Sequence, residues 1–290
     1  MTAAKAERTG IVTTRPLIAR PGVWLTWFVV IFFFVNLAGL VGSVVVSSLY
    51  DHWFDTWWPE VFRPQNYSEA WHAYNLRDVL TVTLEVSLAV VVISAVIGVP
   101  AAYVLARRRF PGKQLVTLAF LLPILVPPIA YGIPLATVLY KYHLAGTITG
   151  VILANLVPSV PFVVLTMTPF IEQIDPKIEA AARMCGATTW SIFMRILAPL
   201  LVPGILAASV LVLVRTVAMF ELTFLTAGND SQTLVVELYH EMSGAGIRRP
   251  QTVDAEAVIY MLMMMVLLVV ALRFVNPTQL VTRVATDKER

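Results

Sequence analysis

Charged residues are scarce in this sequence, since Asp, Glu, Lys and Arg make up only 13% of its 290 residues. A typical soluble domain carries about 25%. Cysteine occurs once, as Cys185, which excludes an internal disulfide and a metal cluster built from cysteines. A Gly-rich phosphate loop is missing, and so is any polar region long enough to fold as a nucleotide-binding domain. The chain therefore has no energy source of its own.

Histidine is also rare, and its four copies give no catalytic pattern. All four lie outside the long apolar runs, and neither His-Glu-x-x-His nor Gly-x-Ser-x-Gly occurs. The four are His52, His72, His143 and His240. An intramembrane enzyme is therefore the weaker of the rival interpretations, and we expect a non-catalytic chain without a cofactor.

Apolar residues, in contrast, make up 58% of the sequence and gather in long runs. A soluble core cannot bury so much apolar surface, whereas a bilayer about 30 Å thick accepts helices of about 20 such residues. The sequence predicts an all-α, polytopic membrane protein in contact with lipid. The net charge of +3 is modest, and we expect no nucleic-acid partner.

Six transmembrane helices are predicted. They cover residues 23–50, 79–106, 115–140, 147–170, 200–227 and 255–272. We divide the chain into an N-terminal tail, a first helix with an external aromatic segment, a core of five helices, and a C-terminal tail. These regions are 1–20, 21–78, 79–275 and 276–290.

The basic residues predict the orientation of the chain. Fifteen of the 21 Lys and Arg lie in the two tails and in the loops after the second and fourth helices, against five on the other side. The positive-inside rule then places both termini in the cytosol. The basic N-terminal tail lacks a cleavage pattern, so we predict an uncleaved first helix. The aromatic segment 51–78 favours an interfacial belt, with a ligand-stacking site as the alternative.

The loop at 171–199 carries the most specific pattern. Pro176 suits the first position of a short helix that continues to Met184, and Gly186 allows a sharp reversal. Thr188 or Thr189 can then cap a second short helix, which we expect to end before Pro199 opens the fifth transmembrane helix. The pattern predicts a helix–turn–helix on the cytosolic face.

This loop resembles the EAA loop of type I ABC importer permeases, the inner membrane components of binding-protein-dependent transport systems. With Gly186 in register, Ile196 and Pro199 occupy their family positions. Two positions depart from the pattern: the family glutamate position is Ala180, with Glu179 one residue earlier, and the leucine before the proline is Ala198. Further likeness runs through segments 101–112, 133–135, 144–153 and 157–162, which are most similar to carbohydrate importers.

The resemblance implies a fold, a location and a set of partners. It implies a type I ABC importer permease fold in the bacterial inner membrane, with the loop acting as a coupling helix in a groove of the ATPase. The implied partners are an ABC ATPase dimer, a second and different permease chain, and an extracytoplasmic solute-binding protein. The loop residues expected to contact or shape the ATPase interface are Glu179, Ala180, Ala181, Gly186, Ala187, Trp190, Ile196 and Pro199.

The solute is less sharply indicated. The likeness to carbohydrate importers favours a saccharide or polyol, while segment 220–228 also resembles permeases for polyamines or iron complexes. An ion-coupled secondary transporter is the remaining alternative, but it is expected to show more intramembrane acids and two inverted halves.

Two ionisable residues fall inside the predicted fifth helix, where a charge is costly. Arg215 and Glu221 are six positions apart, which places them on different faces of one helix. We expect Glu221 to border the solute pathway, and Arg215 to face it or to pair with the second permease. The full set of predicted pathway residues is Glu221, Phe220, Thr223, Arg215, Pro127 and Tyr131. Prolines crowd the third helix and indicate a bent pathway helix, or an ordinary kink.

Overall fold

The computed structural model describes residues 21–51, 61–244 and 249–274, and these are almost entirely helical. The two tails, and the aromatic residues Trp53, Trp57 and Trp58, lie outside the described residues. Within the described part, the two-residue strands β1 (Tyr50–Asp51) and β2 (Val61–Phe62) pair antiparallel. The all-α prediction is confirmed.

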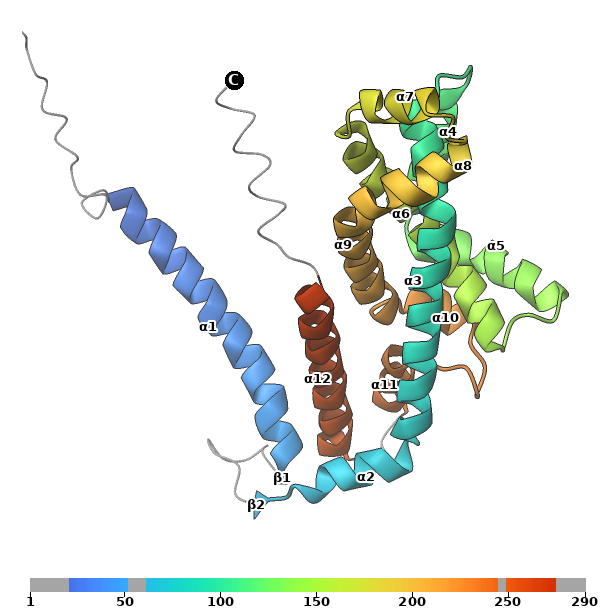
Figure 1. Ribbon diagram of the computed structural model, residues 1–290. Helices are drawn as coiled ribbons and strands as arrows, with labels where there is room; N and C mark the ends of the chain where they lie inside the picture. Colours follow the sequence, from blue (N-terminus) through green and yellow to red (C-terminus); the bar gives the residue numbers. More distant parts are fainter. Residues whose placement is uncertain (1–20, 52–60, 245–248, 275–290) are drawn as a thin grey trace, which may run out of the picture.

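Within the described residues, five helical segments are long and apolar enough to cross a membrane. Four are the single helices α1 (Pro21–Leu49), α3 (Leu76–Arg107), α6 (Ile148–Glu172) and α12 (Pro250–Phe274). The fifth runs over Thr189–Val217. Figure 1 shows α3, α6 and α9 side by side, with α12 and then α1 to one side of them. The prediction of long helices in these regions is confirmed, with ends shifted by a few residues except in the fifth.

The third predicted helix is broken rather than straight. It consists of α4 (Lys113–Leu125) and α5 (Pro128–Lys141), whose axes differ by 98°. Val126 and Pro127 adopt extended backbone conformations between them, and neither Pro127 nor Pro128 has an N–H to continue the helical ladder. The pair forms one bent unit in Figure 1, with α5 projecting sideways.

The fifth predicted helix begins and ends earlier than expected. It starts at α8 (Thr189–Ile192), passes through a π-helical turn, η2 (Phe193–Leu197), and continues as α9 (Ala198–Val217). Pro199 therefore sits near the start of α9 without separating it from the loop helix, and in the π turn before it the Ala198 N–H donates to the Phe193 carbonyl. The prediction of one helix to residue 227 is wrong, since α10 (Glu221–Thr226) is a separate short helix.

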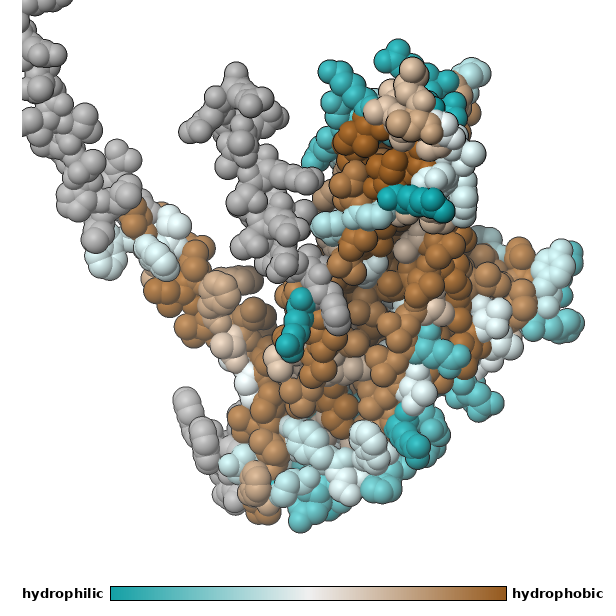
Figure 2. Space-filling view, viewed as in Figure 1, coloured by the Kyte–Doolittle hydropathy of each residue, from teal (hydrophilic) through white to brown (hydrophobic). Residues whose placement is uncertain are grey.

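The core lies where α3 crosses α6 closely. A Cβ atom on Gly98 would lie 2.7 Å from a methyl carbon of Val163, so only glycine allows this approach. Fully buried residues such as Val90, Val164 and Met167 fill the same interface. Figure 2 shows the complementary feature, an apolar band around the middle of the visible face with hydrophilic residues at both ends. That band is the expected lipid-facing surface.

The end of the bundle opposite the 171–199 loop carries α2 (Gln65–Ala73) and α11 (Leu234–Ser243) (Figure 1). Here α1 packs mainly against α12, and the Ser47 hydroxyl donates to the Asp254 carboxylate between them. Arg63 pairs with Asp51 and Glu69 and so holds the strands to α2. The charged hydrogen bond to Glu69 raises the pKa of Arg63 above its ordinary value.

Candidate functional site

The 171–199 loop folds as the predicted helix–turn–helix. The side chain of Asp175 caps α7 (Pro176–Met184) by accepting from the Lys177 N–H at 2.9 Å. Gly186 then takes a positive φ of 82°, a left-handed conformation that favours glycine. The Thr188 hydroxyl accepts from the Ser191 N–H and caps α8. Figure 1 places α7 and α8 together at one end of the bundle.

Glu179 is buried and bonded within the chain. Its side chain is 5% exposed, and its carboxylate accepts from the Tyr103 hydroxyl at 2.9 Å and from Arg107 Nε at 2.7 Å. Arg107 also donates from Nη2 to the Ile174 carbonyl at 2.6 Å. Arg183 lies at 3.6 Å on the outer side. We call Tyr103, Arg107 and Glu179 the Glu179 clasp; it fastens α7 to the last turns of α3.

Aromatic contacts extend this connection to the second loop helix. The Tyr103 ring meets Phe193 edge to face at 5.5 Å, and Phe193 stacks with Trp190 at 6.4 Å between ring centroids. Both halves of the loop are therefore attached to the end of α3.

The outward face of the loop exposes several large apolar side chains. Met184 is 90% exposed and Trp190 68% exposed, while Ile178 and Met194 are also exposed. Among the other predicted loop residues, Ala180 and Ala181 are exposed, and Pro199 is exposed at the start of α9. Ala187 is half-buried against the core, and Ile196 is half-buried in η2. The loop thus has an inner face bound to the bundle and an outer face without cover in the described chain.

The structure brings three of the predicted pathway residues together inside the bundle. Tyr131 of α5 lies within electrostatic reach of Arg215, in the last turn of α9, and of Glu221, the first residue of α10. The Arg215 guanidinium sits 5.6 Å from the centre of the Phe162 ring. The two charges occupy different helices, which corrects the prediction that one helix carries both. We call Tyr131, Arg215 and Glu221 the bundle cluster.

Polar groups of this cluster are incompletely satisfied within the described residues. The Tyr131 hydroxyl is buried and has no hydrogen-bond partner there. None of the ion pairs recorded for the described residues joins Arg215 to Glu221. Buried polar groups normally find partners, so this region is suited to a solute, water or a second subunit.

The three remaining predicted pathway residues lie in different surroundings. Thr223 is buried next to the cluster and accepts from Asn155 Nδ2 at 3.3 Å. Phe220 instead stacks with Phe224 and contacts Tyr239 of α11. Pro127 is exposed at the bend between α4 and α5, and the structure shows no contact that joins it to the cluster.

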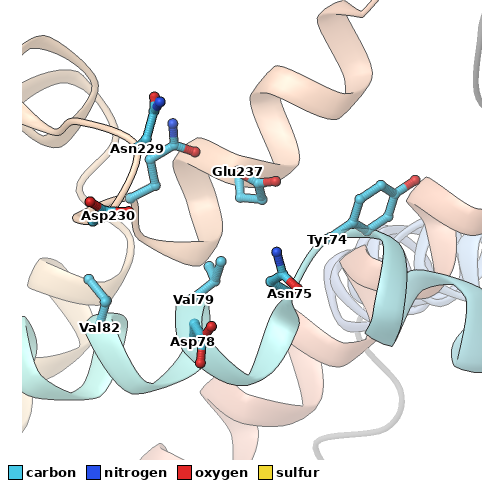
Figure 3. Close-up of a pocket in the computed structure, with 9 residues that line it drawn as sticks. Tyr74, Asn75, Asp78, Val79, Val82, Asn229, Asp230 and Glu237 are labelled. Carbon is cyan, nitrogen blue, oxygen red and sulfur yellow. The ribbon is translucent and has the colours of Figure 1, made fainter.

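A polar pocket of about 380 Å³ opens at the end of the bundle opposite the 171–199 loop (Figure 3). The start of α3 forms one side and the segment from Asn229 to Glu237 forms the other. Three carboxylates line it, those of Asp78, Asp230 and Glu237. An opening with this charge attracts cations and repels anions at close range.

Sequence reasoning missed several residues of these sites. Arg107 was visible only as one of a run of basic residues, and Tyr103 only as part of an apolar helix. Asn155 and Phe162 lie in the predicted fourth helix without any local signal for their partners. The polar contacts join residues that are 67 to 76 positions apart in the sequence, and no local pattern encodes such pairs.

The long apolar helices and the bent pair α4–α5 are those of a multi-pass membrane protein. Residues 95–279 match the family described as the binding-protein-dependent transport system inner membrane component, and the chain belongs to that family. The resemblance to ABC importer permeases is thereby confirmed.

Curated relatives transport different solutes, according to their names. The molybdenum transport system permease protein ModB of Haemophilus influenzae is 31% identical over 176 residues, or 55% of this chain and 77% of the relative. The sulfate transport system permease protein CysT of Escherichia coli is 32% identical over 51% of this chain and 58% of the relative. The trehalose transport system permease protein SugB of Mycobacterium tuberculosis is 32% identical over 54% and 57%. The chain thus spans between about half and three quarters of these relatives.

Solved structures share the fold over more of the chain. A bacterial ABC transporter that imports the acidic polysaccharide alginate superposes with a TM-score of 0.68 at 16% identity, covering 87% of this chain and 94% of the other. The MetNI methionine ABC transporter gives a TM-score of 0.55 at 20% identity, covering 72% and 98%. At these identities the likeness concerns the fold alone.

Proposed function

We propose that this chain is one permease subunit of an ATP-driven, binding-protein-dependent importer, forming half of its translocation pathway. The observation that carries the proposal is the outer face of the 171–199 loop. Met184 and Trp190 expose most of their side-chain surface on this face, and no other part of the described chain covers them. A groove on an ATPase would cover these side chains and supply the energy that the chain itself lacks.

The proposed assembly contains an ABC ATPase dimer, a second permease subunit and an extracytoplasmic solute-binding protein. The second permease is a different chain in our proposal, which would make the complex heteromeric. The loop end, with both termini, faces the cytosol, as the distribution of basic residues favours. The acid-lined pocket then lies on the outer side, where solute arrives.

The solute that we propose is a carbohydrate or polyol. The bundle cluster offers a hydroxyl, a cation and a carboxylate, a set that can bind the hydroxyl groups of a neutral solute through both donors and acceptors. The similarity to a trehalose permease supports this class. The three carboxylates of the outer pocket oppose a divalent oxyanion such as sulfate, and they favour a polyamine as the second candidate.

Reconstitution of the purified complex in vesicles tests the function. Uptake of labelled trehalose, mannitol, spermidine, sulfate and molybdate is measured with and without ATP, in the presence of the cognate binding protein. ATP-dependent uptake of a sugar or polyol is expected. Uptake driven only by an ion gradient would contradict the importer, and ATP-dependent uptake of an oxyanion would contradict the proposed solute.

Glu221→Gln tests the pathway role of the bundle cluster. We expect a changed KM or a lower uptake rate for the solute at normal expression, because the carboxylate accepts hydrogen bonds on the proposed route. Glu85→Gln, on an exposed position of α3, is the matched control. Wild-type uptake by Glu221→Gln would remove Glu221 from the pathway.

A further inference from the structure

The Glu179 clasp joins the loop to one particular transmembrane helix. Of the residues that hold α7 in place, Tyr103 and Arg107 both belong to the last turns of α3. The main-chain carbonyl of Ile174, at the start of the loop, is held by the same Arg107 side chain. A single helix end therefore grips the loop at two points.

The inward direction of the Glu179 side chain follows from its place one residue before the family glutamate position. Successive residues on a helix point 100° apart, so a glutamate at position 179 and one at position 180 face different sides. Ala180 is exposed on the outer side, while Glu179 points inward and is 4% exposed. The carboxylate is thus committed to α3 and leaves no acid on the outer face of the middle of α7.

The contacts of α3 would transmit a movement of the 171–199 loop to other helices of the bundle. It has its most extensive helix contact with α6, at the close crossing of Gly98, and it also packs against α9. Arg215 of α9 belongs to the bundle cluster and lies over the ring of Phe162 of α6, and Asn155 of α6 donates to Thr223 of α10. Tightly packed helices move as units because a dense interior does not deform continuously.

We propose that Tyr103, Arg107 and Glu179 are positioning residues that make the 171–199 loop and the end of α3 move as one unit, so that ATPase movement enters the bundle through α3. This role rests on the proposed function, because it has meaning only if the loop docks on an ATPase. The clasp is predicted to affect the coupling of ATP hydrolysis to transport more than the docking itself.

Arg107→Gln and Arg108→Gln form a matched pair. Each removes one positive charge from the same segment, but Arg108 is exposed and makes none of the clasp contacts. In the assembled importer, Arg107→Gln and Glu179→Gln should lower the solute imported per ATP hydrolysed about fivefold or more, the usual scale of coupling between sites. ATPase copurification should stay at the wild-type level. Arg108→Gln should match the wild type.

A charge-swapped variant separates coupling from simple loss of folding. Arg107→Glu combined with Glu179→Arg restores the ion pair without the Ile174 contact, and it should recover part of the transport ratio lost in either single variant. No recovery, with all variants folded, would overturn the proposal. An unchanged transport ratio in Arg107→Gln and Glu179→Gln would overturn it too.

The native thiol gives a direct readout of movement. Cys185 is the only cysteine in the sequence and is exposed in the turn after α7. Spin labels at Cys185 and at Arg109→Cys, just past α3, should keep one distance distribution with and without ATP and vanadate. Arg107→Gln should broaden that distribution. A wild-type distance that changes through the cycle would overturn the rigid link, whereas a wild type without ATP-dependent uptake would contradict the proposed function instead.

Discussion

Glu179 shows how strongly one position matters on a short helix. Family resemblance places the functional glutamate at position 180, where this chain has an exposed alanine. The structure turns the neighbouring acid inward and leaves Lys177, Ile178, Arg183 and Met184 on the outer side of α7. A docking partner therefore needs an apolar groove for the methionine and carboxylates for the cations.

Met184→Asp tests that docking face. Burial of a methionine side chain contributes about 1.5–3 kcal/mol, so a carboxylate in its place should weaken ATPase binding at least about tenfold. The measurement is titration of detergent-solubilised permease with the purified ATPase. Met242→Asp is the control, because Met242 is 71% exposed on α11 at the other end. Equal affinities for both variants would contradict docking through Met184.

At the scale of elements, the close crossing of α3 and α6 holds the bundle together. The neighbouring Cβ and Cγ1 atoms of Val163 lie 2.8 and 2.7 Å from the position that a Cβ on Gly98 would occupy. These are β-branched side-chain atoms with little freedom to move. The crossing therefore depends on the absence of a side chain at one residue.

Gly98→Val is expected to destabilise the protein by about 1–3 kcal/mol, the usual cost of overpacking. Thermal unfolding followed by fluorescence-detected gel filtration in detergent gives the measurement. Gly39→Val is the control, because a Cβ at Gly39 meets nothing within 4 Å. A melting temperature for Gly98→Val equal to that of the control would contradict the prediction, because α3 and α6 would then accept a side chain at their crossing without loss of stability.

Hydropathy predicted the existence of the long helices because lipid selects for runs of apolar residues, and local signals predicted the loop. Pro176, Gly186 and Thr188 each act within their own turn, so their roles were readable. Pro127 and Pro128 indicated a bend, but its angle depends on packing far along the chain. Pro199 led to a wrong start for the fifth helix, since the helix continues without a break through the π turn before this proline. The clasp and the bundle cluster join distant segments, and only the fold reveals them.

At the scale of the whole molecule, the bent pair α4–α5 determines the parity of the topology. If it crosses the membrane, the chain has an even number of crossings and both ends lie on one side. If it only enters and returns, the ends lie on opposite sides. Figure 1 shows that the first residue of α1, Pro21, and the last residue of α12, Phe274, lie at the ends of these helices that point toward the side of α7.

Reporter fusions test this parity. Green fluorescent protein fused after residue 290 and, separately, before residue 1 should fluoresce, because both ends are predicted to be cytosolic. Alkaline phosphatase inserted after Lys141, between α5 and α6, should be active on the outer side. Fluorescence from only one of the two terminal fusions would mean that α4–α5 does not cross.

The packing of α1 has a consequence for how the protein is made. None of the apolar window of α1 is buried within the chain, and its main neighbour is α12. Ser47 and Asp254, which bond between them, are 207 residues apart. At synthesis rates of about 5–20 residues per second, α1 waits roughly 10–40 s for its partner. During that interval only the short helix α2 is available to contact the end of α1, through Asn66 and Tyr67 at Ser48. α1 must therefore be stable in the bilayer largely through its own hydrophobicity, and a ribosome that stalls before α12 leaves the first helix without its main packing partner.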